Sequence, residues 1–223
     1  NEGELNPDLV RITRNTPLFE NIPSFNNKKH AYIKDSELKF IIHLLFSNQS
    51  PLAYSRNIKL NYDNFADLLK LGILTIDDFD DYQKDYIKLI IEEEIIIEDN
   101  KILKFNNDAF NLLDYYYHNH VICLTYNEDN KYLKKIIEEE KIKFDGSLFS
   151  KDEVDYLNYI LNDRSFDNGL SLRNKYLHGS YYAENEKENE IDYFKLLKIY
   201  ALIIIKINEE FCRNNDTWNK SEE

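Results

Sequence analysis

The chain has 223 residues, of which 43% are hydrophobic, so it can form one large domain or two small ones around a core. It carries 41 acidic and 28 basic residues, and this gives a net charge of -13. That charge excludes a protein that coats nucleic acid through a broad phosphate-binding surface. Any contact with RNA is therefore expected to be a small local patch of cations.

The two cysteines, Cys123 and Cys212, offer neither a disulfide framework nor metal-finger spacing, so we expect a reducing, cytoplasmic setting with no metal or cofactor. The longest apolar run, residues 199–205, is far shorter than the roughly 20 residues of a membrane span, so no membrane contact is expected. The sequence begins with Asn1 and contains no methionine. We therefore expect upstream sequence, such as a sensor domain or a targeting signal.

The N-terminal part of the chain is predicted to be an arm followed by helices. Residues 1–30 contain three of the four prolines and little periodicity, which indicates an extended arm or an excised linker. Apolar residues at helical spacing then predict one helix over residues 35–48 and another over residues 62–71. Thr75 and Asp78 are expected to cap the start of a third helix.

A β-hairpin is predicted after the third helix. The runs 94–98 and 101–105 favour strands, and only Asp99-Asn100 separates them. Three helices followed by a hairpin predict a winged-helix-like unit over residues 31–106. Because its third helix begins with a run of aspartates, a packing or protein-contact role is favoured over DNA reading.

The remainder, residues 107–214, is predicted to be a bundle of helices alone, followed by a disordered tail over residues 215–223. Ser150 and Glu153 form a capping-box signature. The last helix has a wide apolar arc, which predicts the centre of a bundle and, as a sharper alternative, a stripe in a dimer seam. The expected helices are 107–126, 132–140, one after Ser150, a short one ending near Gly179, and 191–212.

The short helix before Gly179 combines the residue types that phosphodiester chemistry needs. Arg173 carries a permanent planar cation that forks onto phosphate oxygens, and His178 exchanges protons near neutral pH. Asn174 lies four residues before His178, on the same helical face, whereas Arg173 and His178 are roughly 140° apart. Either the arginine side chain wraps toward the histidine, or a second copy of the segment supplies the partner across a two-fold axis.

This Arg-Asn-x-x-x-His-Gly pattern in a helical C-terminal half resembles the HEPN superfamily over residues 121–214. The resemblance implies a helical bundle that forms a homodimer, in which two Arg-polar-x-x-x-His segments face each other in a cleft. Many members are endoribonucleases of toxin–antitoxin and phage-defence systems, which implies RNA as substrate and a sensor domain or an antitoxin as partner. Ser180 stands where toxins paired with a nucleotidyltransferase antitoxin usually have tyrosine, so that subgroup is disfavoured.

The resemblance implies a metal-independent endoribonuclease that cleaves RNA by attack of a 2′-hydroxyl on the adjacent phosphorus. His178 would move a proton, Arg173 would stabilise the charge on the phosphate, and Asn174 would orient the imidazole or bind the phosphate. Lys175 and Arg164 are candidates for further contacts to the RNA backbone.

Three alternatives stay open. In a purely structural interpretation, Asn174 hydrogen-bonds His178, Arg173 pairs with a carboxylate, and Tyr176 and Leu177 are core residues. In another, a non-catalytic HEPN-like module uses the same residues to bind RNA, a nucleotide or a partner protein. The third is a winged-helix regulator with a helical dimerisation domain, against which the acidic third helix argues.

A metal site is disfavoured elsewhere in the chain. His118 and His120 are about 200° apart on a helix and so cannot hold one ion together.

Overall fold

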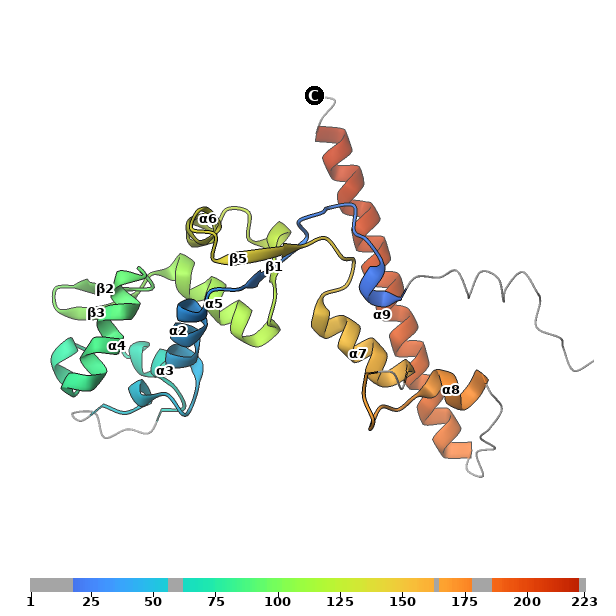
Figure 1. The fold of residues 1–223 in the computed structure, drawn as a ribbon, viewed down its shortest axis with the longest axis horizontal. Coiled ribbons are helices and arrows are strands. Elements are labelled where there is room, and N and C mark those ends of the chain that lie inside the picture. The colour runs from blue at the N-terminus through green and yellow to red at the C-terminus, as the bar shows by residue number, and fades with distance from the viewer. Residues whose placement is uncertain (1–17, 56–61, 163–164, 178–185, 221–223) are drawn as a thin grey trace, which may run out of the picture. The chain divides into compact units, whose positions relative to one another are not determined.

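The computed structural model describes residues 18–55, 62–162, 165–177 and 186–220, and at positions 174, 177 and 213–220 it describes the backbone alone. Over these residues the chain is mainly helical and has two small antiparallel sheets, which confirms the predicted mainly α class (Figure 1). None of the described helices combines the length and the apolar character that crossing a bilayer requires.

Contacts divide the chain into two compact units. We call Lys28–Asp145 the central unit, and Asn1–Asn27 with Gly146–Glu223 the terminal unit. The division differs from the predicted boundary after residue 106. The reason is that the helix after that boundary, α5 (Asn107–Asn119), buries Leu112 and Leu113 in the core of the central unit.

The central unit contains a three-stranded antiparallel sheet. Its middle strand, β1 (His30–Ile33), lies between β4 (Ile122–Cys123) and β5 (Ile142–Asp145). β1 pairs with β5 in a register that joins Ile33 to Ile142. The prediction of helices alone beyond residue 107 is therefore wrong for β4 and β5. Strands of two to four residues carry too few side chains to show the alternation that identifies a strand.

Five helices surround a single apolar core in the central unit. Residues from all five are buried in this core, including Leu44, Phe65, Ile90, Leu112 and Ile136. The core explains why this region forms helices, since each presents one apolar face to it. The helices are α2 (Ser36–Phe46), α3 (Phe65–Leu69), α4 (Asp81–Glu92), α5 and α6 (Lys131–Glu138).

The cap predicted for the third helix belongs to a smaller element. Thr75 and Asp78 form a capping box around the 3₁₀ turn η3 (Ile76–Asp78). The helix α4 begins later, after Asp80, which forms a second capping box with Gln83. The chain changes direction between the two caps, so the first cap starts only one turn.

The predicted hairpin is confirmed, with its turn displaced by one residue. β2 (Ile96–Asp99) pairs with β3 (Ile102–Phe105), and Asp99 lies opposite Ile102. The turn is therefore Asn100-Lys101, whose φ angles are 52° and 70°. Two positive φ angles are typical of the tight turn that matches the twist of a hairpin.

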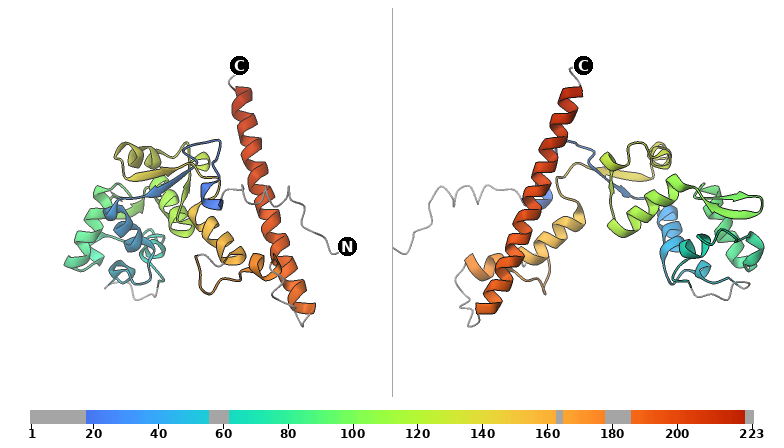
Figure 2. Two further views of the ribbon diagram at one scale, coloured as in Figure 1. Left: turned by 45° about the vertical axis from the view of Figure 1, so that its right-hand side comes forward. Right: turned by 180° about the vertical axis from the view of Figure 1, so that it is seen from behind.

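The described residues of the terminal unit form three α-helices: α7 (Lys151–Leu161), α8 (Leu172–Leu177) and α9 (Glu186–Lys220). Ser150 and Glu153 form the predicted capping box at the start of α7. The helix α9 starts five residues before the predicted residue 191 and stays helical into the expected tail. Figure 2 shows from two sides that the C-terminal end of α9 extends beyond α7 and α8.

Residues 18–27 are packed rather than extended, in contrast to the predicted arm. The 3₁₀ turn η1 (Phe19–Asn21) places the Phe19 ring against Phe149, with 5.9 Å between the ring centroids. Pro23 forms an isolated β-bridge with Ser147. Apolar side chains at Phe19 and Ile22 explain the difference, because they join the small core of the terminal unit.

Candidate functional site

The helix that carries the Arg-Asn-x-x-x-His segment is short and is held against α9 at its first residue. Leu172 opens α8 and is buried in the same apolar cluster as Ile199 of α9. A six-residue helix has too few internal hydrogen bonds to be stable alone. Its place in the unit therefore depends on side-chain anchors.

A buried carboxylate on α9 provides the second anchor. Asp192 is only 5% exposed, and its Oδ2 lies 2.6 Å from the Lys175 Nζ and 3.1 Å from the Tyr176 hydroxyl. Its other oxygen accepts a hydrogen bond from Lys195, at 3.1 Å. Two consecutive residues of α8 thus donate to one oxygen of α9, which fixes the rotation of α8 about its axis.

The anchor also shifts the protonation equilibria of its members. Burial by itself would raise the pKa of Asp192, but hydrogen bonds from Lys175, Lys195 and Tyr176 outweigh burial and hold this pKa below its ordinary value. Desolvation and the hydrogen bond to Asp192 raise the pKa of Tyr176. The carboxylate is therefore ionised and the phenol protonated at neutral pH, as this hydrogen-bond arrangement requires.

Arg173 lies on a different side of α8 from the anchor. Successive helical residues differ by about 100°, so Arg173 and Lys175 point about 160° apart. Lys175 reaches Asp192, whereas Arg173 is exposed, and no described residue forms an ion pair with it. This arrangement gives no support to the structural interpretation in which a carboxylate neutralises Arg173. Tyr176 does not support it either, because its side chain is 42% exposed.

The other predicted site residues differ in what the structure says of them. Lys175 is bound to Asp192, so its geometry supports an anchoring role rather than contact with an RNA backbone. The backbone of Asn174 belongs to α8, but its side chain is not described. His178 and Arg164 lie outside the described residues.

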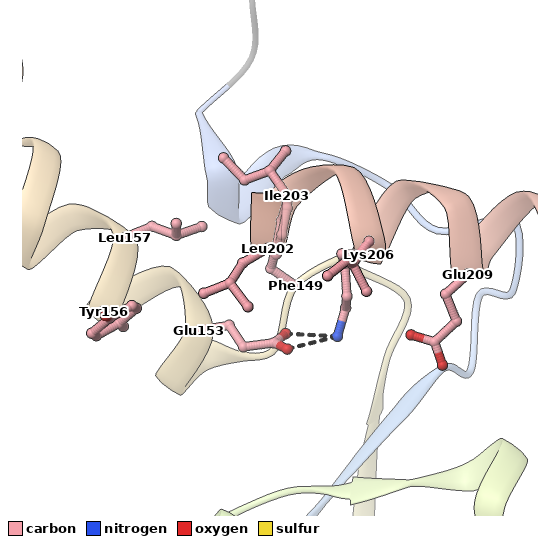
Figure 3. A pocket seen from close by; sticks show the side chains of 9 residues that line it. Phe149, Glu153, Tyr156, Leu157, Leu202, Ile203, Lys206 and Glu209 are labelled. Carbon is pink, nitrogen blue, oxygen red and sulfur yellow. Dashed lines mark hydrogen bonds and ion pairs between the residues drawn. The ribbon is translucent and has the colours of Figure 1, made fainter. Parts of the chain in front are cut away.

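A pocket of about 260 Å³ lies elsewhere in the terminal unit, between α7 and α9 (Figure 3). Its walls are largely apolar, with contributions from Leu157 and Leu202. Lys206 crosses it and binds both carboxylate oxygens of Glu153, at 2.7 and 2.9 Å. Neither Arg173 nor Lys175 lines this pocket, and its one lysine, Lys206, is bound to Glu153, while the third charged group of the lining is Glu209.

Asp192 and Lys195 are residues of the site that the sequence analysis did not identify. A signal was present, because Asp192, Leu196, Ile199 and Ile203 follow the 4-3-4 spacing of a buried helical stripe. A carboxylate in such a stripe requires a cationic partner. Seventeen residues separate Asp192 from Lys175, so local spacing did not indicate which cation that is.

Within the part of the chain that the structure describes, no group of three or more His, Cys, Asp or Glu side chains is arranged to hold a metal ion. Comparisons with known proteins return no match, whether with family models, curated proteins or solved structures. The case for a site therefore depends on the residues of α8 and α9 themselves.

Proposed function

We propose that the terminal unit is a HEPN-like, metal-independent endoribonuclease that acts as a cytoplasmic homodimer. In this proposal it is the effector part of a toxin or antiviral defence protein, and a sensor domain or an antitoxin restrains it. The observation that carries the proposal is the state of Arg173, which is exposed on an anchored helix and has no ion pair with any described residue.

An unpaired arginine is informative in this chain. The sequence contains 41 acidic residues, and neighbouring lysines on the same unit are already neutralised, Lys175 by Asp192 and Lys206 by Glu153. No described carboxylate pairs with the Arg173 guanidinium, whose planar fork matches two oxygens of a phosphate. Anchoring of α8 reduces the entropy that binding would otherwise cost.

The proposed reaction is a transesterification. The 2′-oxygen of a ribose forms a bond to the adjacent phosphorus while the bond from phosphorus to the 5′-oxygen breaks. The 2′-hydroxyl loses a proton and the leaving 5′-oxygen gains one, so the products are a 2′,3′-cyclic phosphate and a 5′-hydroxyl. In this proposal His178, one residue after α8, transfers a proton, Arg173 stabilises the charge on the phosphate oxygens, and Asn174 orients the imidazole.

Residues 31–106 of the central unit are proposed to be winged-helix-like, on the basis of their order of α2, α3, α4 and then the β2–β3 hairpin. The first turn of η3 carries Asp77 and Asp78, and α4 begins at Asp81. Such a concentration of carboxylates repels DNA phosphates, so a protein-contact role is favoured for this unit.

A second candidate function is a non-catalytic HEPN-like module that holds RNA, a nucleotide or a partner protein with the same residues. The acidic start of α9 favours it, because Glu186 and Glu188 follow the motif closely and would repel a phosphate backbone. This candidate predicts binding to Arg173 without a chemical product.

Cleavage of RNA by the purified chain in EDTA distinguishes the two candidates. We expect cyclic-phosphate products, and we expect Arg173→Ala and His178→Ala each to slow cleavage by at least about 100-fold. Lys198→Ala, which removes an exposed cation from α9, is the matched control and should cut like the parent. If both motif variants cut as fast as the parent, the nuclease proposal fails; binding that depends on Arg173 without any product favours the second candidate.

A further inference from the structure

One face of α9 presents a continuous apolar stripe to solvent. Its members are separated by four, three, four, three and four residues. Each is exposed, with fractions from 38% at Ile207 to 65% at Tyr200. We call this stripe the α9 seam: Tyr193, Leu197, Tyr200, Ile204, Ile207 and Phe211.

The seam is separate from the face that holds α9 in its own unit. The inward stripe of α9 includes Asp192 and Ile199, which are buried, and Ile203, which packs on the small core. Each of these residues immediately precedes a seam residue, so the seam is turned about 100° from the inward face. Phe25 packs edge-on against Phe211 at the last position of the seam, with 5.3 Å between the ring centroids. From Tyr193 to Ile207 the seam is exposed in the described part of the terminal unit.

The spacing of the seam identifies what kind of surface covers it. A strict alternation of four and three residues has a mean period of 3.5, and this period keeps one face of a helix in contact with another helix along a left-handed coiled coil. In the sequence the same spacing continues to Asn214 and Trp218. The 35 residues of α9 span about 52 Å, which is long enough for such a pairing.

We propose that the α9 seam binds α9 of a second copy of this chain in a parallel coiled coil. Six side chains that are roughly half exposed would bury on the order of 500 Å² of accessible surface per copy, or about 1,000 Å² for the pair. This area reaches the lower limit of specific interfaces. Charge also favours self-pairing here. Residues 193–212 contain three lysines and two glutamates, so this segment is nearly neutral although the chain carries -13.

The parallel direction rests on the proposed function, whereas the seam does not. Asp192 holds α8 beside the first residue of the seam. In a parallel pair both α8 helices, and both Arg173 side chains, lie at the same end. In an antiparallel pair that overlaps fully, Asp192 of one copy lies near residue 212 of the other, so the two α8 helices are about 30 Å apart along the axis.

Two adjacent isoleucines provide a matched test of the seam. Ile204 belongs to it, whereas Ile205 points about 100° away and is more exposed, at 62%. Light scattering of the full chain over a dilution series should show a dimer for the parent and for Ile205→Lys. Ile204→Lys should weaken dimerisation at least about tenfold, because a charge would be buried in the seam. A monomeric parent, or equal effects of the two substitutions, overturns the proposal.

Disulfide trapping tests the direction, in a Cys123→Ser, Cys212→Ser background. A disulfide requires Cα atoms within about 7 Å, so Tyr193→Cys alone and Phe211→Cys alone should each crosslink in a parallel pair. Crosslinks that form only when the two variants are mixed would show an antiparallel pair and overturn the proposed direction. RNA cleavage is measured separately. Parallel crosslinks without cleavage support the seam and its direction and refute the nuclease. Antiparallel crosslinks with cleavage support the seam and the nuclease and refute the parallel direction.

Discussion

The two units of this chain differ in how they bury their apolar residues. The central unit encloses its own, and Phe65, Ile87 and Ile95 are completely inaccessible to solvent. In the described part of the terminal unit the buried cluster is small, and large side chains on α9 such as Tyr200 and Ile205 stay exposed. Folding stability comes mainly from burial, so the central unit is stabilised by its own packing, and the proposed pairing of α9 would add burial to the terminal unit.

The two units also differ in how their charged side chains pair. Charged side chains of the central unit pair with one another within that unit, as Lys141 does with Glu93 at 2.6 Å. In the terminal unit, Asp192 is the one deeply buried carboxylate among the described residues, and it binds the helix that carries Arg173. In the proposed function, this buried carboxylate positions Arg173 in addition to stabilising the unit. The comparison predicts that changes in the central unit affect stability alone, whereas changes in the terminal unit also affect the proposed chemistry.

The largest expected effect is on the core of the central unit. Phe65 is fully buried and packs edge-on against Phe79, so Phe65→Ala leaves a cavity and should lower the free energy of unfolding of this unit by about 3–5 kcal/mol. Hydrogen exchange of the full chain should show faster exchange in α2 and α5 and unchanged exchange in α7 and α9. Equal loss of protection in α7 would mean that the two units fold as one.

Much of the central unit follows from local sequence patterns. The β2–β3 hairpin and the helices with side-chain caps are marked by residues close in sequence, such as Asn130, which accepts from the Leu133 N–H at 2.8 Å. The strand β1 has no such local signal, because its partner β5 follows more than a hundred residues later. Pairing at that separation depends on the packing of the whole unit, which spacing alone does not reveal.

The candidate site shows the same limit. The sequence shows the Arg-Asn-x-x-x-His segment directly and predicts a short helix that carries it. The structure confirms this helix as α8. The partner of Lys175 was not predicted, because it lies on another helix and any of the 41 acidic residues could have taken that place. The sequence thus indicates which residues could carry the chemistry, whereas the structure is needed to identify Asp192, which holds their helix in place.

The second-largest effect is expected at Asp192, the residue that anchors α8. Asp192→Asn keeps the shape of the side chain but removes the charge that binds Lys175 and Lys195, so α8 should lose its fixed rotation. Misplacement of a catalytic group by about 1 Å costs up to about 100-fold, and we expect kcat to fall by about 10- to 100-fold with little change in KM. Glu190→Gln, an exposed carboxylate two residues earlier, is the control. A variant that cuts at the parental rate would refute a positioning role.

A smaller effect is expected at the start of α7. The Ser150 side chain accepts a hydrogen bond from the Glu153 N–H, and the Glu153 carboxylate accepts one from the Ser150 N–H. Ser150→Ala should therefore lower the stability of the terminal unit by about 1 kcal/mol. Urea unfolding monitored by exchange in α7 measures this loss. No change in stability would show that packing of Phe149 and Val154, rather than the cap, determines where α7 begins.

The smallest effect is a dependence of stability on pH. The pKa of Asp192 is lower in the folded chain than its ordinary value of about 3.9, so its contribution is complete above that value and is lost as the pH falls through the folded pKa. The stability difference between the parent and Asp192→Asn should be constant near neutral pH and shrink below about pH 4. A difference that does not change with pH would show that the carboxylate is not the stabilising form.

The central claim is that the Arg173 segment is half of a site that a second copy completes. Mixing two inactive chains, Arg173→Ala and His178→Ala, tests it most directly. Half of the randomly mixed dimers contain one of each, and each of these has one intact pairing of Arg173 with the partner's His178. Cleavage should therefore recover to about one quarter of the parental rate. A mixture that stays as inactive as either variant alone, although mixed dimers form, would contradict the shared site.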